Sequence, residues 1–322
     1  MKLEDIGFYT LSDERAKNTS ITSPLWRCEL ILTDNCNFKC PYCRGMRSDC
    51  QGTFSLEDAK KVIDYWTNEG LRNVRFSGGE PMLYPHLDYL VKRAHDRGVE
   101  RIAISTNGSF PLERYVKLVG YGLNDISISL DACCVAVGDK MTGGATGSWS
   151  KVVSNIRELS KITYVTVGMV FTEENIEDCK ESVMFADSLG VSDIRVIPSA
   201  QYNEVLTKLA SLDSDVLDKY PILKYRIKNI LHDRHARGIQ KSDCHRCWLA
   251  MDDMAIAGKY HFPCIIYLRE QGKPIGGISD KIREERKFWL ETHDTHTDPI
   301  CRKNCLDVCI DYNNTAERLK RF

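Results

Sequence analysis

The chain has 322 residues, of which 43% are hydrophobic and 28% charged, as is ordinary for a globular protein. Its 44 basic and 45 acidic side chains leave a net charge of −1, which gives no electrostatic reason to bind large nucleic acids or anionic membranes. No stretch approaches ~18 apolar residues and the first residues mix both signs of charge, so we expect a cytoplasmic protein without a membrane span.

A regular alternation of short β-branched runs and amphipathic segments extends from Cys28 to Pro198. The first run, CELILT, is followed by a predicted helix with Ser55 as its N-cap and Gly70 at its end, and then by NVRFSG. About six such units follow one another, with apolar strands typical of a parallel sheet. The sequence therefore predicts an α/β fold, a partial (β/α)6 barrel of the TIM type.

Polar motifs follow four of the predicted strands at the end where a parallel barrel carries its chemistry. They are the loop TDNCNFKCPYCRGM after the first strand, SGGEP after the second, STN at 105–107 after the third, and Asp131 after the fourth. Four such motifs at successive strand ends indicate one shared site.

The rhythm stops after Pro198, where a helical segment interrupted by Pro221 leads to a cysteine-rich end. We expect an N-terminal extension over 1–26, the barrel over 27–235 and a small α+β domain over 236–322. Arg195, Gln201 and Tyr202 follow the last strand, and their roles stay open.

The fourteen cysteines are grouped rather than evenly spread. Closely spaced thiols in a large chain without an export signal indicate metal rather than disulfides. One group is Cys36, Cys40 and Cys43, and the other is Cys244, Cys247, Cys264, Cys301, Cys305 and Cys309.

The first group has three thiols, although a structural zinc site and a cubane iron–sulfur cluster each normally take four ligands. The spacing Cys36-x3-Cys40-x2-Cys43, with Tyr42 before the third cysteine and SGGEP after the next strand, resembles the radical S-adenosylmethionine (SAM) enzymes over about residues 27 to 200. This resemblance implies a [4Fe–4S] cluster held by three cysteines, whose fourth position is taken by SAM. Reductive cleavage of SAM then yields a 5′-deoxyadenosyl radical that abstracts hydrogen from a C–H bond.

The resemblance also assigns the strand ends to the cosubstrate. It implies contacts to the methionine ammonium from SGGE, contacts to ribose and carboxylate from STN, and either role for the end of the fourth strand. The implied contact residues are Tyr42, Ser77, Gly78, Gly79, Glu80, Ser105, Thr106, Asn107, Ser129 and Asp131.

The second cysteine group resembles the auxiliary cluster segment of radical enzymes with SPASM or Twitch extensions. Its six thiols fit one full [4Fe–4S] cluster, with Cys244, Cys247, Cys264 and one of Cys301, Cys305 and Cys309 as ligands. A zinc site is the alternative, because CxxC pairs suit zinc equally well. A thiol left without iron could return a hydrogen atom to a substrate radical.

The resemblance implies an enzyme of the oxidoreductase or epimerase type that acts on a peptide or on a carbohydrate such as an aminoglycoside. A partner such as flavodoxin or ferredoxin would supply the electron. Two alternatives stay open, namely a radical enzyme that acts on a nucleoside or nucleotide, and a metal-stabilised binding protein without chemistry. Histidine ligands from the THDTHTD segment are possible, although this segment favours a solvated loop.

Overall fold

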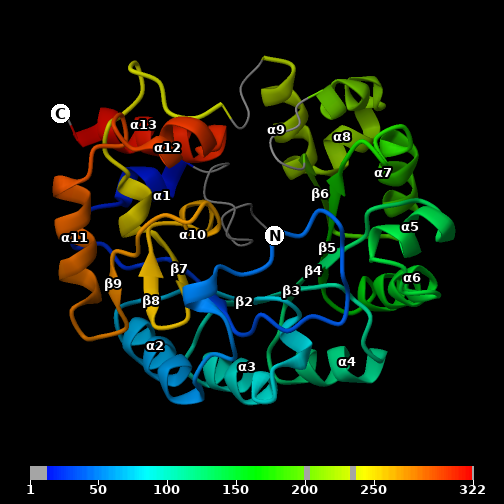
Figure 1. Ribbon diagram of the computed structural model, residues 1–322, viewed down its shortest axis with the longest axis horizontal. Helices are drawn as coiled ribbons and strands as arrows, with labels where there is room; N and C mark the ends of the chain where they lie inside the picture. The colour runs from blue at the N-terminus through cyan, green and yellow to red at the C-terminus, as the bar shows by residue number, and fades with distance from the viewer. Residues whose placement is uncertain (1–12, 199–203, 233–236, 321–322) are drawn as a thin grey trace.

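Nine strands form one open sheet in the computed structural model, which describes residues 13–198, 204–232 and 237–320. The strand order is β6-β5-β4-β3-β2-β1-β7-β8-β9, so β1 lies inside the sheet between β2 and β7. The pairs from β7 through β1 to β6 are parallel, whereas β8 and β9 add antiparallel strands. The predicted partial barrel is confirmed, and the sheet does not close between β6 and β9 (Figure 1).

The elements follow the predicted alternation. The strands are β1 Arg27–Ile31, β2 Asn73–Ser77, β3 Arg101–Thr106, β4 Asp125–Ser129, β5 Tyr164–Phe171, β6 Asp193–Pro198, β7 Asp253–Ala257, β8 Tyr260–Phe262 and β9 Gly276–Gly277. The helices are α1 Asp13–Asn18, α2 Leu56–Asn68, α3 Leu87–Asp96, α4 Leu112–Gly120, α5 Val135–Met141, α6 Ser148–Leu159, α7 Cys179–Ser188, α8 Ser214–Lys219, α9 Pro221–Ile230, α10 Ile265–Arg269, α11 Ile282–Thr292, α12 Pro299–Asn304 and α13 Asp307–Lys320. Short 3-10 helices span Ser48–Cys50, Pro81–Leu83, Glu204–Ser211 and Trp248–Met251.

Helix α2 shows why these segments fold as predicted. The Ser55 hydroxyl accepts a hydrogen bond from the amide of Asp58, and Gly70 ends the helix with a φ of 90°. Its buried face carries Ala59, Val62, Ile63 and Trp66. This spacing of three and four residues places all four side chains on the side that packs against the sheet.

The two faces of the sheet differ in chemistry. Alternate strand residues such as Leu30, Phe76 and Ile104 pack with the surrounding helices into the main apolar core. The residues between them, which include Glu29, Arg75, Asp125 and Arg195, belong to the opposite, inner face. The near-continuous apolar strands of the prediction are therefore apolar on the outer face only, because the inner face lines a polar interior.

The C-terminal residues extend the same sheet. Strand β7 pairs in parallel with β1, and α11, α12 and α13 gather with α1 on that side of the molecule (Figure 1). None of the helices within the described residues is long and apolar enough to cross a bilayer.

Candidate active site

The three clustered thiols follow β1 in a loop that opens onto a cavity. Cys36 and Cys43 are exposed and Cys40 is half-buried. Free cysteine is usually among the most buried residues, so this loop presents its thiols to the cavity instead of packing them into the core. Backbone N–H groups of Phe38 and Gly45 each donate to a thiol sulfur, of Cys36 and Cys43 respectively, at 3.4 Å.

The loop rests directly on the two glycines that follow β2. The amide of Gly79 donates to the Thr33 carbonyl at 2.6 Å, and the amide of Glu80 donates to the Asn35 carbonyl at 2.7 Å. A Cβ atom on Gly79 would lie 2.3 Å from the Asn35 oxygen. Only glycine allows this approach, so the cysteine loop and the SGGEP motif form one unit.

The structure brings most of the predicted contact residues to this cavity. Together with the three thiols, its walls include Tyr42, Ser77, Gly78, Gly79, Ser105, Thr106, Asn107, Ser129 and Asp131. Further lining residues, which the sequence analysis missed, are Phe38, Met141, Thr142, Trp149 and Arg269. Met141 and Trp149 look like ordinary apolar helix positions in the sequence, and Arg269 comes from a distant segment. Gln201 and Tyr202 lie outside the described residues.

Glu80 does not face the cavity, although it is among the residues expected to contact the methionine ammonium. Its side chain is fully buried, and its carboxylate accepts hydrogen bonds from the Thr106 hydroxyl at 2.7 Å, the Asn107 amide at 2.7 Å and the Met82 amide at 3.0 Å. Burial raises the pKa of this carboxyl even though the three donors oppose the shift. The carboxylate therefore fixes the end of β3, and the glycines before it form the cavity wall.

Asp131 and Tyr42 join the cysteine loop to the end of β4. The Tyr42 hydroxyl donates to the Asp131 carboxylate, which also accepts the Val170 amide at 2.7 Å. Burial raises the pKa of Asp131 to about 6, although both hydrogen bonds oppose the shift. This bond holds the Tyr42 ring, and with it the Cys43 end of the loop, against the barrel.

Without a bound cation, the surroundings of Cys36 and Cys40 disfavour the thiolate form. Burial, with a further contribution from Asp131, raises the pKa of Cys40 to about 11, and burial also raises the pKa of Cys36. Metal ligation requires the thiolate form, and a bound cationic metal centre supplies the charge that stabilises it. Three accessible thiols in one loop, above glycines that leave the wall open, fit an iron–sulfur cluster with room for a further ligand.

The second cysteine group also converges in space. Burial and the nearby Cys309 raise the pKa of Cys247 to about 12, and burial, Cys309 and Cys247 raise the pKa of Cys264. The pKa of Cys301 is raised by burial and by Cys247, and that of Cys305 by its hydrogen bond to Cys309 and by burial. Each of the other five C-terminal thiols thus lies within electrostatic reach of Cys247.

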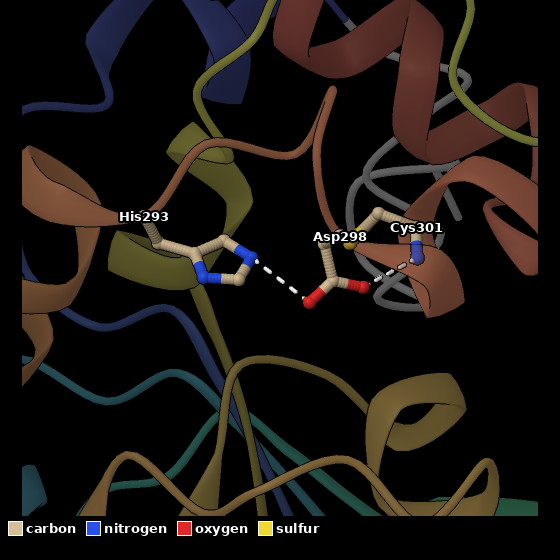
Figure 2. A group of neighbouring side chains, drawn as sticks. All are labelled: His293, Asp298 and Cys301. Atoms are coloured by element: carbon tan, nitrogen blue, oxygen red, sulfur yellow. Dashed lines mark hydrogen bonds and ion pairs between the residues drawn. The ribbon is translucent and has the colours of Figure 1, made fainter.

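One mixed group of possible metal ligands lies beside these thiols. The ligand atoms of His293, Asp298 and Cys301 fall within 4.8 Å of one another. Figure 2 shows that the His293 ring and the Cys301 backbone amide both meet the Asp298 carboxylate. Asp298 also caps α12 through the Ile300 amide and accepts the Tyr267 hydroxyl at 2.8 Å. Because its oxygens are already hydrogen-bonded, this carboxylate serves the helix start.

The THDTHTD segment is only partly the solvated loop that the sequence favours. Thr295 and Asp298 are buried, and His293 stacks on Trp289 with the ring centroids 4.2 Å apart. His261, which lies outside this segment, is fully buried between Glu285 and Arg286. Burial and Arg286 lower its pKa to about 2, so this ring stays neutral.

Comparison with known proteins places this site in a family. Residues 30–186 match the model of the Radical SAM superfamily. The probable GTP 3′,8-cyclase of Saccharolobus solfataricus is 30% identical over 221 residues, which cover 66% of this chain and 70% of that protein. The probable GTP 3′,8-cyclase of Sulfurisphaera tokodaii is 26% identical over 244 residues, which cover 69% and 77%. The chain belongs to the radical SAM superfamily and is a radical SAM enzyme.

Solved structures agree on the fold. SuiB of Streptococcus suis bound to its precursor peptide SuiA has a TM-score of 0.62 at 15% identity, covering 92% of this chain and 69% of that chain. The enzyme anSMEcpe with bound AdoMet and a peptide has a TM-score of 0.62 at 16% identity, covering 92% and 98%. At this identity the likeness is one of architecture alone.

The expected peptide or carbohydrate substrate is wrong. The sequence relatives carry the name of a nucleotide cyclase, and this name favours the nucleotide alternative. The expectation depended on the resemblance of the second cysteine group to the auxiliary cluster segments of other radical enzymes. Similar cluster segments can serve different substrates because the walls of the cavity select the substrate.

Proposed function

We propose that this radical SAM enzyme acts on a purine nucleotide, with GTP as the first substrate to test and intramolecular ring closure as the reaction. The observation that carries the proposal is the sequence similarity to enzymes named GTP 3′,8-cyclase, which extends over two thirds of the chain. Ring closure replaces the epimerase or oxidoreductase outcome, because the relatives are named cyclases.

The cofactor would be held by the residues around the cavity. Cys36, Cys40 and Cys43 would ligate the cluster, and the backbone of Gly78 and Gly79 would line the place of the methionine moiety. When bound, the [4Fe–4S] cluster and SAM supply the radical that abstracts hydrogen. The residues of this chain would position both groups, and Met141, Trp149 and Val152 form an apolar part of the cavity wall.

The inner face of the barrel supports an anionic substrate. Arg195 aligns with Gly168, and Gly168 aligns with the cavity-lining Ser129, so this arginine lies at the level of the site. Burial and the neighbouring Arg75 and Arg226 lower the pKa of Arg195 to about 10. The Asp125 carboxylate opposes this shift, and guanidinium groups suit the phosphate oxygens of an anionic substrate.

The substrate test is an anaerobic assay with reconstituted protein, SAM and dithionite. We expect GTP to be consumed together with SAM, with formation of 5′-deoxyadenosine and a new nucleotide product. Guanosine should react at least tenfold less well, because it lacks the phosphates. Arg195→Gln should weaken GTP binding, whereas Arg157→Gln on the exposed face of α6 should not. Failure of GTP and of other nucleoside triphosphates to bind would overturn the proposal.

We also propose that the C-terminal thiols hold an auxiliary [4Fe–4S] cluster. Cys264, Cys301, Cys305 and Cys309 all lie within electrostatic reach of Cys247, an arrangement that suits shared ligation. The reconstituted protein should contain about eight irons, and the Cys36/Cys40/Cys43→Ala variant about four, without 5′-deoxyadenosine formation. A fall from about four irons to none would mean that the C-terminal thiols hold no cluster.

A further inference from the structure

The end of β3 reaches the cysteine loop through one side chain, Asn107. The side-chain nitrogen of Asn107 lies 3.9 Å from the Cys36 sulfur. The same nitrogen donates a hydrogen bond to the side-chain oxygen of Asn37 at 2.8 Å. Asn37 in turn donates to the Ser109 hydroxyl at 2.9 Å. The two asparagines therefore connect the loop after β3 to the loop that carries the thiols.

The hydrogen-bond network fixes which end of the Asn107 amide faces the sulfur. The backbone N–H of Ser109 donates to the Asn107 side-chain oxygen at 3.0 Å. Since this oxygen already receives a donor and the other end meets the Asn37 oxygen, the nitrogen must point toward Cys36.

The backbone of Asn107 is held as firmly as its side chain. Its N–H donates at 2.7 Å to the carboxylate of Glu80, which is fully buried and also holds Thr106. The next residue, Gly108, has a φ of 74°, and a Cβ there would lie 2.7 Å from a methyl carbon of Ile128. The turn that aims Asn107 is therefore anchored on both sides.

We propose that Asn107 is a tuning residue for the radical cluster, in which its side-chain N–H donates to the Cys36 sulfur and raises the reduction potential of the cluster. Hydrogen bonds to cluster sulfurs stabilise the reduced state, which carries the more negative charge. The Phe38 amide donates to the same sulfur from within the loop, so Asn107 adds a donor that the loop itself lacks. Glu80 and Gly108 are positioning residues in this arrangement, because they hold the turn that carries the donor.

The test is a potentiometric titration of the reconstituted full-length protein with dithionite, followed by EPR in the absence of SAM and substrate. Signals of this cluster are those that the Cys36/Cys40/Cys43→Ala variant lacks. Asn107→Leu keeps the branched shape and the number of heavy atoms of the side chain and removes the donor. We expect the ratio of reduced to oxidised cluster at a fixed potential to fall about tenfold, which is about 59 mV for a one-electron couple.

Two further variants make the result decisive. Asn107→Ser keeps an oxygen that can accept the Ser109 amide, but its hydroxyl lies one bond closer to the backbone and cannot reach the Cys36 sulfur. It should therefore lower the potential even if Asn107→Leu loads iron poorly. Ser109→Ala breaks the bond to Asn37 and leaves the Asn107 donor, so it should keep the wild-type potential. If Asn107→Ser left the reduction potential of the cluster unchanged, or if Ser109→Ala lowered it as much as Asn107→Leu does, Asn107 would have only a structural role.

Discussion

Asp193 shows how the polar interior of the barrel changes the chemistry of a single residue. Its side chain is almost completely buried, and it accepts hydrogen bonds from the Ile194 amide at 2.7 Å and the Tyr164 hydroxyl at 3.5 Å, with the Ile222 backbone also close by. Burial raises its pKa to about 6, although the Ile194 amide and Arg195 oppose the shift. At neutral pH the folded protein therefore holds a desolvated carboxylate.

The raised pKa predicts a pH-dependent stability. The pKa of an unfolded aspartate is about 3.9, so between pH 4 and 6 the folded protein binds more protons at Asp193 than the unfolded chain. Asp193 should then contribute a fall of about 2 kcal/mol in the unfolding free energy as the pH rises through this window, so Asp193→Asn should lose about 2 kcal/mol less than the wild type. Urea unfolding of the metal-free proteins at pH 4.5 and pH 7 measures the difference. If the unfolding free energy changed equally between pH 4.5 and pH 7 in both proteins, Asp193 would not be the cause of the pH dependence.

At the same scale, the sequence predicts the chemistry of the site better than its orientation. The thiol spacing and the SGGEP motif identify the cavity residues, because both are short and local. Nothing in the sequence tells that the Glu80 carboxylate turns away from the cavity, since this depends on donors at residues 82, 106 and 107. Arg269 reaches the cavity from a segment more than 200 residues away, so no local pattern could identify it.

Among the elements, the loop after β1 and the turn after β2 depend on each other through Gly79. A Cβ at Gly79 would approach the Asn35 oxygen to 2.3 Å and the Asp34 oxygen to 2.6 Å, and both are backbone atoms that cannot move alone. Gly79→Ala should therefore displace the cysteine loop from the turn after β2. We expect a loss of about 2 kcal/mol in unfolding free energy and less than half the wild-type iron at the first cluster.

Gly120 at the end of α4 provides the matched control. A Cβ there meets no other atom within 4 Å. Gly120→Ala should leave iron content unchanged and, since alanine favours helix, stabilise by up to about 1 kcal/mol. Iron analysis and thermal unfolding of the two variants test the pair. Normal iron loading in Gly79→Ala would show that the cysteine loop can adjust to a side chain at position 79.

Element boundaries depart from the prediction where side chains compete with the helix. The amphipathic spacing of residues 174–189 is typical of one helix, but α7 begins only at Cys179. The Asn175 side chain donates to the Asp131 carbonyl at 2.7 Å and the Val170 carbonyl at 2.9 Å, and it accepts the Thr172 amide at 2.7 Å. These bonds hold residues 172–175 in a turn that caps β5, and local helix propensity cannot reveal them.

For the whole molecule, the C-terminal segment forms part of the sheet core. Ile256 of β7 aligns with Leu30 of β1, and both are fully buried in the main apolar core. The sequence predicts a boundary near residue 235 because the βα rhythm ends there. This boundary stays a prediction. The pairing of β1 with β7 joins strands more than 200 residues apart in the sequence, and the periodicity of a sequence cannot reveal such a long-range contact.

This arrangement predicts that damage in β7 spreads into the barrel. Ile256→Ala removes a buried side chain against β1 and should lower the unfolding free energy of the whole chain by about 3 kcal/mol. Phe288→Ala on α11 is the control, because Phe288 is 67% exposed and its loss should cost less than about 0.5 kcal/mol.

Hydrogen exchange distinguishes the two ways in which the chain could respond. If β7 belongs to one cooperative core, amides of β2 and β3 exchange faster in Ile256→Ala, by the same factor as those of β7. Faster exchange confined to β7, β8 and β9 would mean that the C-terminal segment folds as a unit of its own.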